Sequence, residues 1–271
     1  MDGEGKRDAL RQAANVVGAL FQAGMTLVAS AGIREVVETG PPSLVEPAGY
    51  TFTIWALIFA LSFAYAVYQA LPANRESLLL RRIGWFTATA FFFTGLWSAF
   101  VPLRQLLFAQ AMLLGVFACL FVAYARLAGS ERGVLRGADR WLVALPLGPF
   151  LGWITAANAV SLTSEAVRSG LVAPGGAGEA ALGTVILLVG ALLACAGILA
   201  GRTGPVQAYL TYGATVLWAL IGIVVNQYAY SLLTTGAALF AAILVAVVLF
   251  VTLRRGRPVG SARQIARPGK A

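Results

Sequence analysis

Aromatic residues at helical spacing are the first feature of this sequence that could bind a ligand. The segment GYTFTIWALIF places Phe52, Trp55 and Phe59 at positions i, i+3 and i+7, so the three rings share one face of a helix. Aromatic rings bury large apolar surfaces and pack in stacked or edge-on arrangements against other rings. The pattern predicts the wall of a site for a flat hydrophobic molecule.

The chain has six tryptophans, which divide into two groups by their distance from charged residues. Trp85 and Trp141 come just after arginines, which is typical of anchors at a membrane–water boundary. At about 1.5 Å per residue from the predicted helix ends, the others fall at or outside the middle of a bilayer: Trp55, Trp97, Trp153 and Trp218. These four are predicted to line a pocket that opens outward.

Polar stripes accompany two of these tryptophans. Thr155 and Asn158 lie at helical spacing in the apolar segment 141–164, and Trp218 belongs to a similar stripe in 206–226. An asparagine that faces lipid is costly, so these stripes should face the interior of a bundle. Hydrogen bonds between helices, worth about 0.6 kcal/mol each on average, explain such stripes equally well. A ligand-orienting role for Thr155 and Asn158 is therefore a hypothesis with a structural alternative.

Several kinds of reactive group are missing from the sequence. There is no histidine, which excludes a His-ligated haem, an imidazole proton relay and a His-based metal site. The only lysines, Lys6 and Lys270, are terminal, and Cys119 and Cys195 lie singly in apolar segments. No carboxylate lies deep in an apolar segment, because Glu165 is at the outer end of its own. We therefore expect no catalytic residues, no bound metal and no cofactor.

The elements that position these residues are predicted to be membrane helices. Of 271 residues, 59% are hydrophobic and 11% are charged, against about 25% charged in a typical soluble domain. A helix needs about 20 apolar residues to cross a bilayer. Eight stretches meet this length: 13–33, 50–71, 84–102, 105–127, 141–164, 180–201, 206–226 and 230–253. The sequence predicts an all-α membrane protein, a polytopic bundle of about eight transmembrane helices.

The basic residues fall mostly on one side of this predicted bundle. Only Arg34, Arg104 and Arg168, of 20 lysines and arginines, lie in loops assigned to the other side. The positive-inside rule then places both termini in the cytoplasm, with a cytoplasmic segment 1–12 and a basic tail 254–271. The net charge of +9 is thus explained by an interaction of basic residues with the lipid bilayer. We expect the bilayer as a partner and no nucleic-acid partner. We expect a multi-pass protein of the cell inner (plasma) membrane.

The N-terminal segment has an alternative interpretation. Lys6 and Arg7, an apolar stretch and the small residues 28–31 resemble a cleaved signal peptide. The stretch is long for such a signal, and Asn15 and Gln22 are unusual in one. We therefore keep it as the first of eight helices.

Small residues recur at four-residue spacing in the segment 180–201. Gly190 and Ala194 form one pair, and Gly197 and Gly201 form another. Such pairs let helix backbones approach closely. They serve packing within the bundle or a homodimer, and the sequence does not distinguish these two uses.

Three motifs in order resemble the tryptophan-rich sensory protein family, also called TspO, the translocator protein or the peripheral benzodiazepine receptor. They are PAGYTFTIWALIF at 47–59, TGLWSAF at 94–100 and PFLGWITAANAVSL at 149–162. The resemblance covers residues 13–165 and implies a five-helix membrane unit. Residues 166–253 would add three transmembrane helices, as in a longer bacterial branch of the family.

The resemblance also implies a ligand and some of its contacts. The family binds porphyrins and related flat molecules, and Trp55, Trp97, Trp153 and Asn158 match its motif positions. Thr94 stands where the family motif has asparagine, and Phe59 where tyrosine is usual. These departures remove two hydrogen-bonding groups and put the same ligand in question.

Our hypothesis is a non-enzymatic membrane protein that binds a tetrapyrrole or another flat hydrophobic molecule in a sensory or trafficking role. Three alternatives stay open: a transporter of a neutral or amphipathic solute with helices kinked at Pro146 and Pro149, a membrane enzyme acting on a lipid or isoprenoid, and a structural or partner-binding protein. The predicted ligand-binding residues are Phe52, Trp55, Phe59, Trp97, Trp153, Thr155, Asn158 and Trp218.

Overall fold

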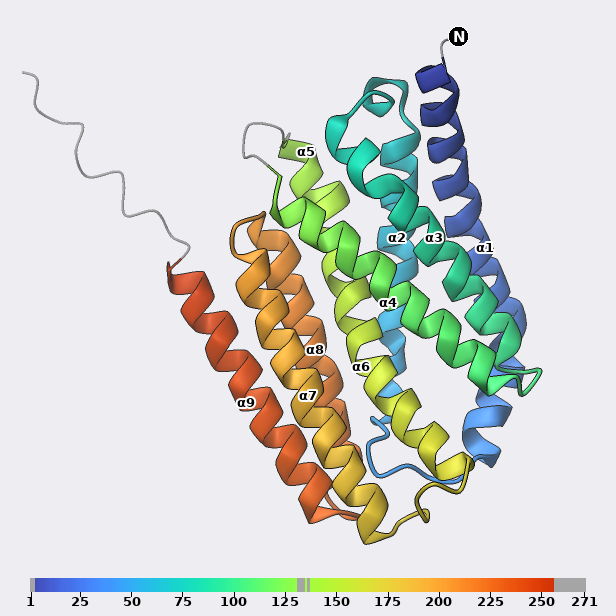
Figure 1. Cartoon of the computed structure of the whole chain (residues 1–271), viewed down its shortest axis with the longest axis vertical. Helices are drawn as coiled ribbons and strands as arrows, with labels where there is room; N and C mark the ends of the chain where they lie inside the picture. The colour runs from blue at the N-terminus through green and yellow to red at the C-terminus, as the bar shows by residue number, and fades with distance from the viewer. Residues whose placement is uncertain (1–2, 131–134, 136, 256–271) are drawn as a thin grey trace, which may run out of the picture.

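The computed structural model describes residues 3–130, 135 and 137–255 and folds them into one bundle of long helices (Figure 1). The described part contains eight helices long and apolar enough to cross a membrane, which confirms the predicted all-α polytopic fold. The long helices are α1 (Gly3–Thr39), α2 (Ile54–Ala70), α3 (Leu78–Phe100), α4 (Leu106–Ala128), α6 (Leu145–Arg168), α7 (Ala177–Gly201), α8 (Val206–Gln227) and α9 (Leu232–Arg255). The short ones are the 3₁₀ turns η1 (Gly49–Thr53) and η2 (Pro72–Asn74), α5 (Gly137–Asp139) and the π-helical turn η4 (Arg140–Ala144).

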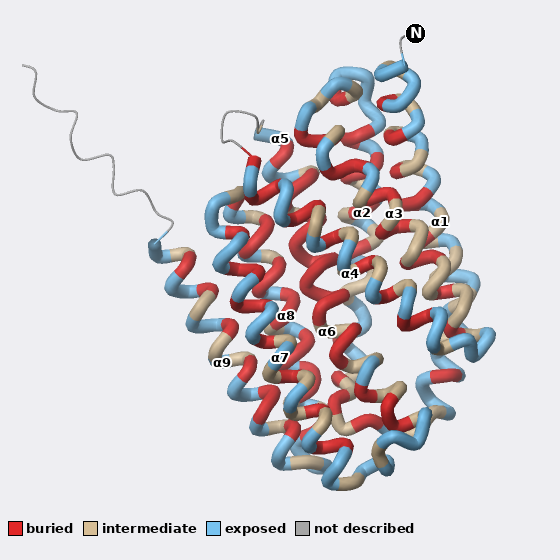
Figure 2. The backbone as a smooth tube through the Cα atoms, in the orientation of Figure 1, coloured by how far each residue is buried: buried red, intermediate tan, exposed pale blue. Residues whose placement is uncertain are grey.

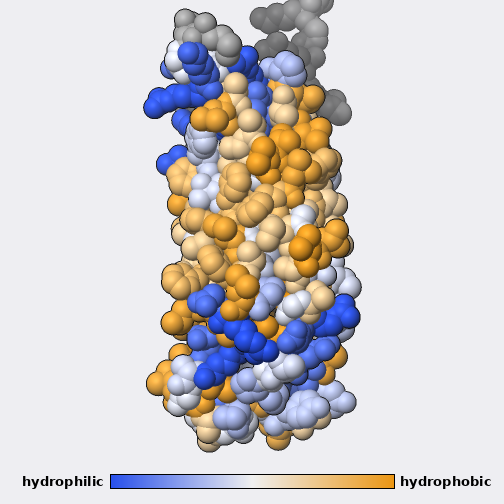
Figure 3. All heavy atoms as spheres, turned by 90° about the vertical axis from the view of Figure 1, so that its right-hand side faces the viewer, coloured by the Kyte–Doolittle hydropathy of each residue, from blue (hydrophilic) through white to orange (hydrophobic). Residues whose placement is uncertain are grey.

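The surface of the bundle matches a bilayer. Figure 3 shows an apolar band around the middle of one face, with hydrophilic residues gathered toward both ends. The start of α1 and the end of α9 lie at the same end of the bundle (Figure 1). Most of the predicted basic tail, residues 256–271, lies outside the described residues.

Helix α6 is the central helix of the bundle (Figure 2). The span Gly137–Arg168 comprises α6 and the turns that precede it, and 72% of the residues in its most apolar stretch are buried. The corresponding fraction in α9 is 28%. The close neighbour of α6 is α8, because two glycines remove side chains from the interface. A Cβ atom on Gly148 would lie 2.6 Å from the Ala208 carbonyl oxygen, and one on Gly152 would lie 2.7 Å from that of Tyr212. A Gly-xxx-Gly pair on α6 therefore lets α8 approach.

A proline inside α6 leaves one backbone carbonyl without its usual partner. Pro149 has no N–H to donate to the Leu145 carbonyl four residues earlier. The hydroxyl of Thr211 on α8 lies 3.5 Å from that oxygen. Neighbouring side chains commonly satisfy such carbonyls in membrane helices. The break in the α6 hydrogen-bond ladder is thus covered by α8.

Helix α1 begins ten residues before the predicted span of 13–33. The charged residues near the start of α1 do not interrupt the helix, because they have partners on the neighbouring segments. Asp8 forms an ion pair with Arg81, and Arg11 donates a 2.6 Å hydrogen bond to the Arg75 carbonyl. Hydropathy alone detects the apolar part of such a helix and not an end held by ion pairs.

The small residues of α7 have two different environments. A Cβ on Gly197 would lie 2.9 Å from the ring of Tyr212, and the Tyr124 hydroxyl packs against Gly201. This second pair therefore packs within the bundle. A Cβ on Gly190 would meet nothing within 4 Å, and the homodimer stays a prediction.

Candidate functional site

Three helices bring their aromatic rings together in one cluster. Trp55 on α2 stacks on Phe59 of the same helix, with ring centroids 5.3 Å apart and planes at 25°. It also stacks on Trp97 of α3, at 5.9 Å and 21°. Trp55 is thus stacked between neighbours from its own helix and from α3.

The α6 rings meet this stack edge-on. Trp153 lies 6.3 Å from Trp55 with the planes at 79°, and 5.5 Å from Phe52 at 80°. Phe150, one turn earlier on α6, lies 6.4 Å from Trp55. Edge-to-face pairs of this kind contribute about 0.5–1.5 kcal/mol each beyond the area they bury. We call these six residues the aromatic cluster: Phe52, Trp55, Phe59, Trp97, Phe150 and Trp153.

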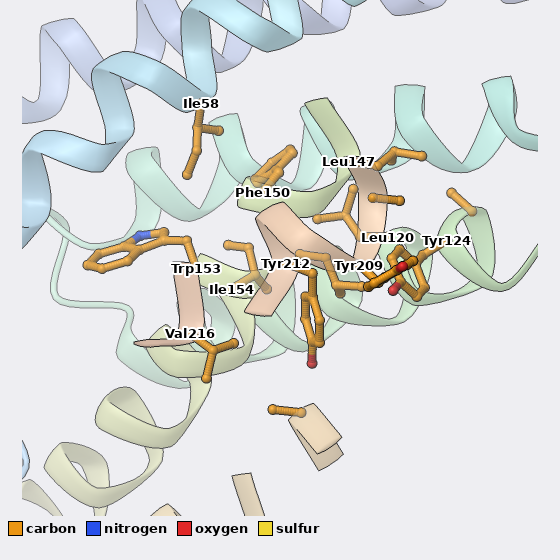
Figure 4. Close-up of a cluster of buried hydrophobic side chains, with 14 of the residues drawn as sticks. Ile58, Leu120, Tyr124, Leu147, Phe150, Trp153, Ile154, Tyr209, Tyr212 and Val216 are labelled. Carbon is orange, nitrogen blue, oxygen red and sulfur yellow. The ribbon is translucent and has the colours of Figure 1, made fainter. Parts of the chain in front are cut away.

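The cluster has a buried inner end and a more open outer end. Trp153 is 3% exposed, and its indole N–H has no hydrogen-bond partner among the described residues. Phe52 is 40% exposed, and Trp55 is half-buried. Figure 4 shows Trp153 and Phe150 on the side of α6 near Ile58, away from Tyr212. An orphaned donor at the base of an aromatic wall suits a ligand with a hydrogen-bond acceptor.

The rings of the aromatic cluster pack directly against one another. A cavity of about 10 Å³ lies beside the cluster and is lined in part by Phe150, Ser62 and the hydrogen-bonded pair Tyr65 and Thr87. A volume near 10–15 Å³ holds about one water molecule. A tetrapyrrole therefore enters the cluster only if the rings separate.

Asn158 faces a different neighbour from Trp153. Five residues along an α-helix correspond to a rotation of about 140° between the two side chains. The Asn158 oxygen accepts a 3.0 Å hydrogen bond from the Gln110 amide of α4, and its nitrogen donates to the Ile154 carbonyl at 2.9 Å. Gln110 is a single amide inside an apolar segment and was not predicted as a partner of Asn158. The Asn158 amide is thus held between α6 and α4.

Thr155 points toward α8. Its hydroxyl donates to the Leu151 carbonyl at 2.8 Å and lies 3.5 Å from the hydroxyl of Tyr212. The polar stripe of α6 is therefore divided between two helix interfaces. A role of Thr155 and Asn158 in binding a ligand stays a prediction.

Trp218 contacts the loop that leads into the cluster. Its indole N–H donates a 3.0 Å hydrogen bond to the Thr51 carbonyl, and its ring meets Tyr50 edge-on at 5.2 Å. Phe52 follows directly in the chain. Trp218 therefore holds the end of the loop rather than joining the ring stack.

This loop, residues 40–53, is called the outer loop below; it is the blue segment near the lower ends of the helices in Figure 1. Its backbone is bonded to both α7 and α8. The Glu179 carboxylate accepts the Leu44 N–H at 2.7 Å, and Gln227 donates to the Glu46 carbonyl at 2.8 Å. Neither Glu179 nor Gln227 was predicted as a contact of this loop. Each lies next to one end of a predicted apolar segment, where a loop can reach it.

Lowering the pH is expected to tighten the outer loop through Glu46. Burial raises the pKa of Glu46 above its usual range, and the opposing effects of the Ser43 backbone and Arg168 are smaller. The folded protein thus binds this proton more tightly than the unfolded chain does. The stabilisation is complete below the unfolded pKa and is lost as the pH rises through the folded one.

Hydrogen–deuterium exchange of the outer loop checks this expectation. The protection factor of peptides within residues 43–48, corrected for intrinsic rates, should fall as the pH rises above the usual glutamate pKa. In Glu46→Gln this decline should flatten, and protection at neutral pH should exceed that of the wild type. An unchanged pH profile in the variant would refute the role of Glu46.

The described residues hold no group of three or more histidine, cysteine or acidic side chains that could bind a metal ion. In comparisons with known proteins, the sequence model of one family, described as TSPO-like protein, matches residues 12–251. The match spans all eight long helices, including the three beyond residue 165. No curated protein and no solved structure matches the chain.

Proposed function

We propose a function for this chain on the basis of its family, since it belongs to the TSPO-like protein family. The proposed function is binding of a flat hydrophobic molecule of the tetrapyrrole class by the aromatic cluster, in a sensory or trafficking role. The protein would lie in the plasma membrane with both termini in the cytoplasm, as the distribution of arginines predicts.

The observation that carries the proposal is the aromatic cluster with the buried, unpartnered indole N–H of Trp153. A buried polar group without a partner costs about 1–3 kcal/mol. Structural packing alone would be better served by a phenylalanine at this position. A flat ligand that carries a carbonyl or carboxylate would stack on Trp55 and accept this hydrogen bond.

Titration of the purified protein with protoporphyrin IX tests the proposal. Saturable quenching of tryptophan fluorescence is expected, with about one molecule bound per chain. An acyclic apolar molecule such as squalene should not compete, because it has no flat ring system. Failure to observe saturable quenching would contradict the proposed ligand class.

Transport of a neutral or amphipathic solute is the second candidate, and the irregular start of α6 favours it. The π-helical turn η4 and Pro149 interrupt regular helix geometry in the central helix of the bundle. Such interruptions are frequent at functional sites. Solute uptake into proteoliposomes that is abolished in Asn158→Ala would favour transport. Tight protoporphyrin binding without flux would favour a sensor.

A further inference from the structure

We propose that the start of α3 and the end of α4 form a site for the phosphate of an anionic phospholipid, with Arg82 and Arg126 as its cationic groups. Both helix ends lie at the end of the bundle where α1 begins (Figure 1). Along α3, at about 1.5 Å per residue, Arg82 is about 22 Å from Trp97 of the aromatic cluster. This is therefore a second site, whose existence does not depend on the proposed function.

The Arg126 side chain is held in place across the two helices. Its Nη1 atom donates a 2.9 Å hydrogen bond to the Arg82 carbonyl, and its guanidinium carbon lies 4.4 Å from the centroid of the Phe86 ring. A guanidinium is attracted to the face of an aromatic ring and stacks on it. An arginine fixed in this way loses less side-chain freedom when it binds an anion. The contacts therefore preorganise Arg126 beside the backbone of Arg82.

Arg82 and Arg126 carry positive charges that the described part of the chain does not neutralise. Both side chains are exposed, and neither takes part in an ion pair with any residue that the structure describes. The preceding residue, Arg81, differs because it pairs with Asp8 and Glu4 of α1. Two neighbouring positive charges without a counter-ion repel one another. An anion bound by both Arg82 and Arg126 would remove this repulsion.

Exposed aromatic rings lie next to both arginines, toward the middle of each helix. Trp85 follows Arg82 by about one turn of α3 and is 43% exposed. On α4, Phe121 precedes Arg126, is 45% exposed and stacks on Phe117 with the ring centroids 6.0 Å apart. Tryptophan is enriched where headgroups meet acyl chains. Charged groups at the helix ends, followed by exposed rings, match the order of phosphate and acyl chains in a phospholipid.

These features favour a phospholipid that carries a net negative charge. A guanidinium binds phosphate oxygens through its planar fork of N–H groups. Basic pockets between membrane helices bind anionic headgroups in this way. A zwitterionic lipid has its own cation close to the phosphate and gains less from two arginines. Phosphatidylglycerol, whose only charge is the phosphate, is therefore a suitable probe.

Fluorescence quenching by brominated lipids tests the site. The full chain is reconstituted into phosphatidylcholine nanodiscs that contain increasing fractions of dibrominated phosphatidylglycerol or of dibrominated phosphatidylcholine. Bromine quenches a tryptophan only at close range, and each protein is measured with and without Trp85→Phe to isolate the signal of Trp85. We expect half of this signal to be quenched at about a tenfold lower fraction of brominated phosphatidylglycerol than of brominated phosphatidylcholine.

Arg82→Gln/Arg126→Gln should abolish this preference, so that the two brominated lipids quench Trp85 equally. Lys6→Gln/Arg7→Gln is the matched control, because it removes two exposed positive charges from α1 at the same end of the bundle. The control should keep the tenfold preference, since neither of its residues contributes to the site. Excess inorganic phosphate should leave the quenching by phosphatidylglycerol intact, because the acyl chains add contacts that a free anion lacks.

Equal quenching by both lipids in the wild type would overturn the site, and so would a preference that survives in Arg82→Gln/Arg126→Gln. Equal loss of preference in the two double variants would show that total positive charge attracts the lipid, which also contradicts a site at these two arginines. Recovery of Trp85 fluorescence in excess inorganic phosphate would show that the arginines bind a free anion and would overturn the assignment to a lipid.

Discussion

Trp153→Ala is expected to weaken protoporphyrin binding about 100-fold. The substitution removes the ring that meets both Phe52 and Trp55 and deletes the buried indole N–H. A lost stacking surface and a lost hydrogen bond together correspond to about 3 kcal/mol, or two factors of ten in the dissociation constant. Equilibrium titration of the purified variant measures this change.

Trp153→Phe separates the two contributions. Phenylalanine keeps a ring against Phe52 and Trp55 but cannot donate a hydrogen bond, so about a tenfold loss is expected. Trp141→Phe is the matched control, because Trp141 is 60% exposed and lies outside the aromatic cluster. Equal affinity in Trp153→Phe and the wild type would show that the ligand does not use the indole N–H.

Gly152→Val is expected to lower the stability of the bundle by about 1–3 kcal/mol, the usual cost of overpacking. A Cβ at this position would lie 2.7 Å from the Tyr212 carbonyl and 3.0 Å from the Thr215 Cβ, so α8 must move away from α6. The apparent thermal midpoint in detergent, followed by circular dichroism, measures the loss.

Gly190→Val provides the comparison for Gly152→Val. Both glycines lie inside long helices, but a Cβ on Gly190 meets nothing within 4 Å. This variant should keep a midpoint close to that of the wild type. Similar losses in the two variants would mean that the close approach of α6 and α8 is not what Gly152 provides.

Five of the six residues of the aromatic cluster could be singled out from the sequence because they obey local rules, whereas Phe150 was not predicted. Phe52, Trp55 and Phe59 follow helical spacing, and Trp97 and Trp153 fall at or outside the middle of the bilayer in their segments. Depth along each predicted helix restricts which rings can meet, even before the packing is known. The structure brings these five residues together, whereas Trp218 lies against Tyr50 and Thr51; their role in binding a ligand stays a prediction.

The directions of the polar residues could not be predicted in the same way. Helical spacing shows that Thr155 and Asn158 lie near one another, but not which neighbouring helix each one faces. Asn158 meets α4 through Gln110, and Thr155 meets α8 through Tyr212. The hydrogen bond between Leu44 and Glu179 joins residues 135 positions apart. Only the packing of the whole bundle determines such a contact.

The aromatic cluster and the outer loop are in contact with each other. The rings pack against one another, and the outer loop that carries Phe52 is bonded to α7 and α8. Ligand binding would then exchange ring–ring contacts for ring–ligand contacts.

The most direct test compares two double variants that each lack two tryptophans. Binding of protoporphyrin IX, followed by the shift of its Soret absorption band, is measured for Trp55→Ala/Trp153→Ala and for Trp85→Ala/Trp141→Ala. The first pair removes the centre of the aromatic cluster, whereas the second removes exposed residues outside it. We expect the first variant to lose saturable binding and the second to bind like the wild type. Equal binding by both variants would contradict the assignment of the aromatic cluster as the ligand site.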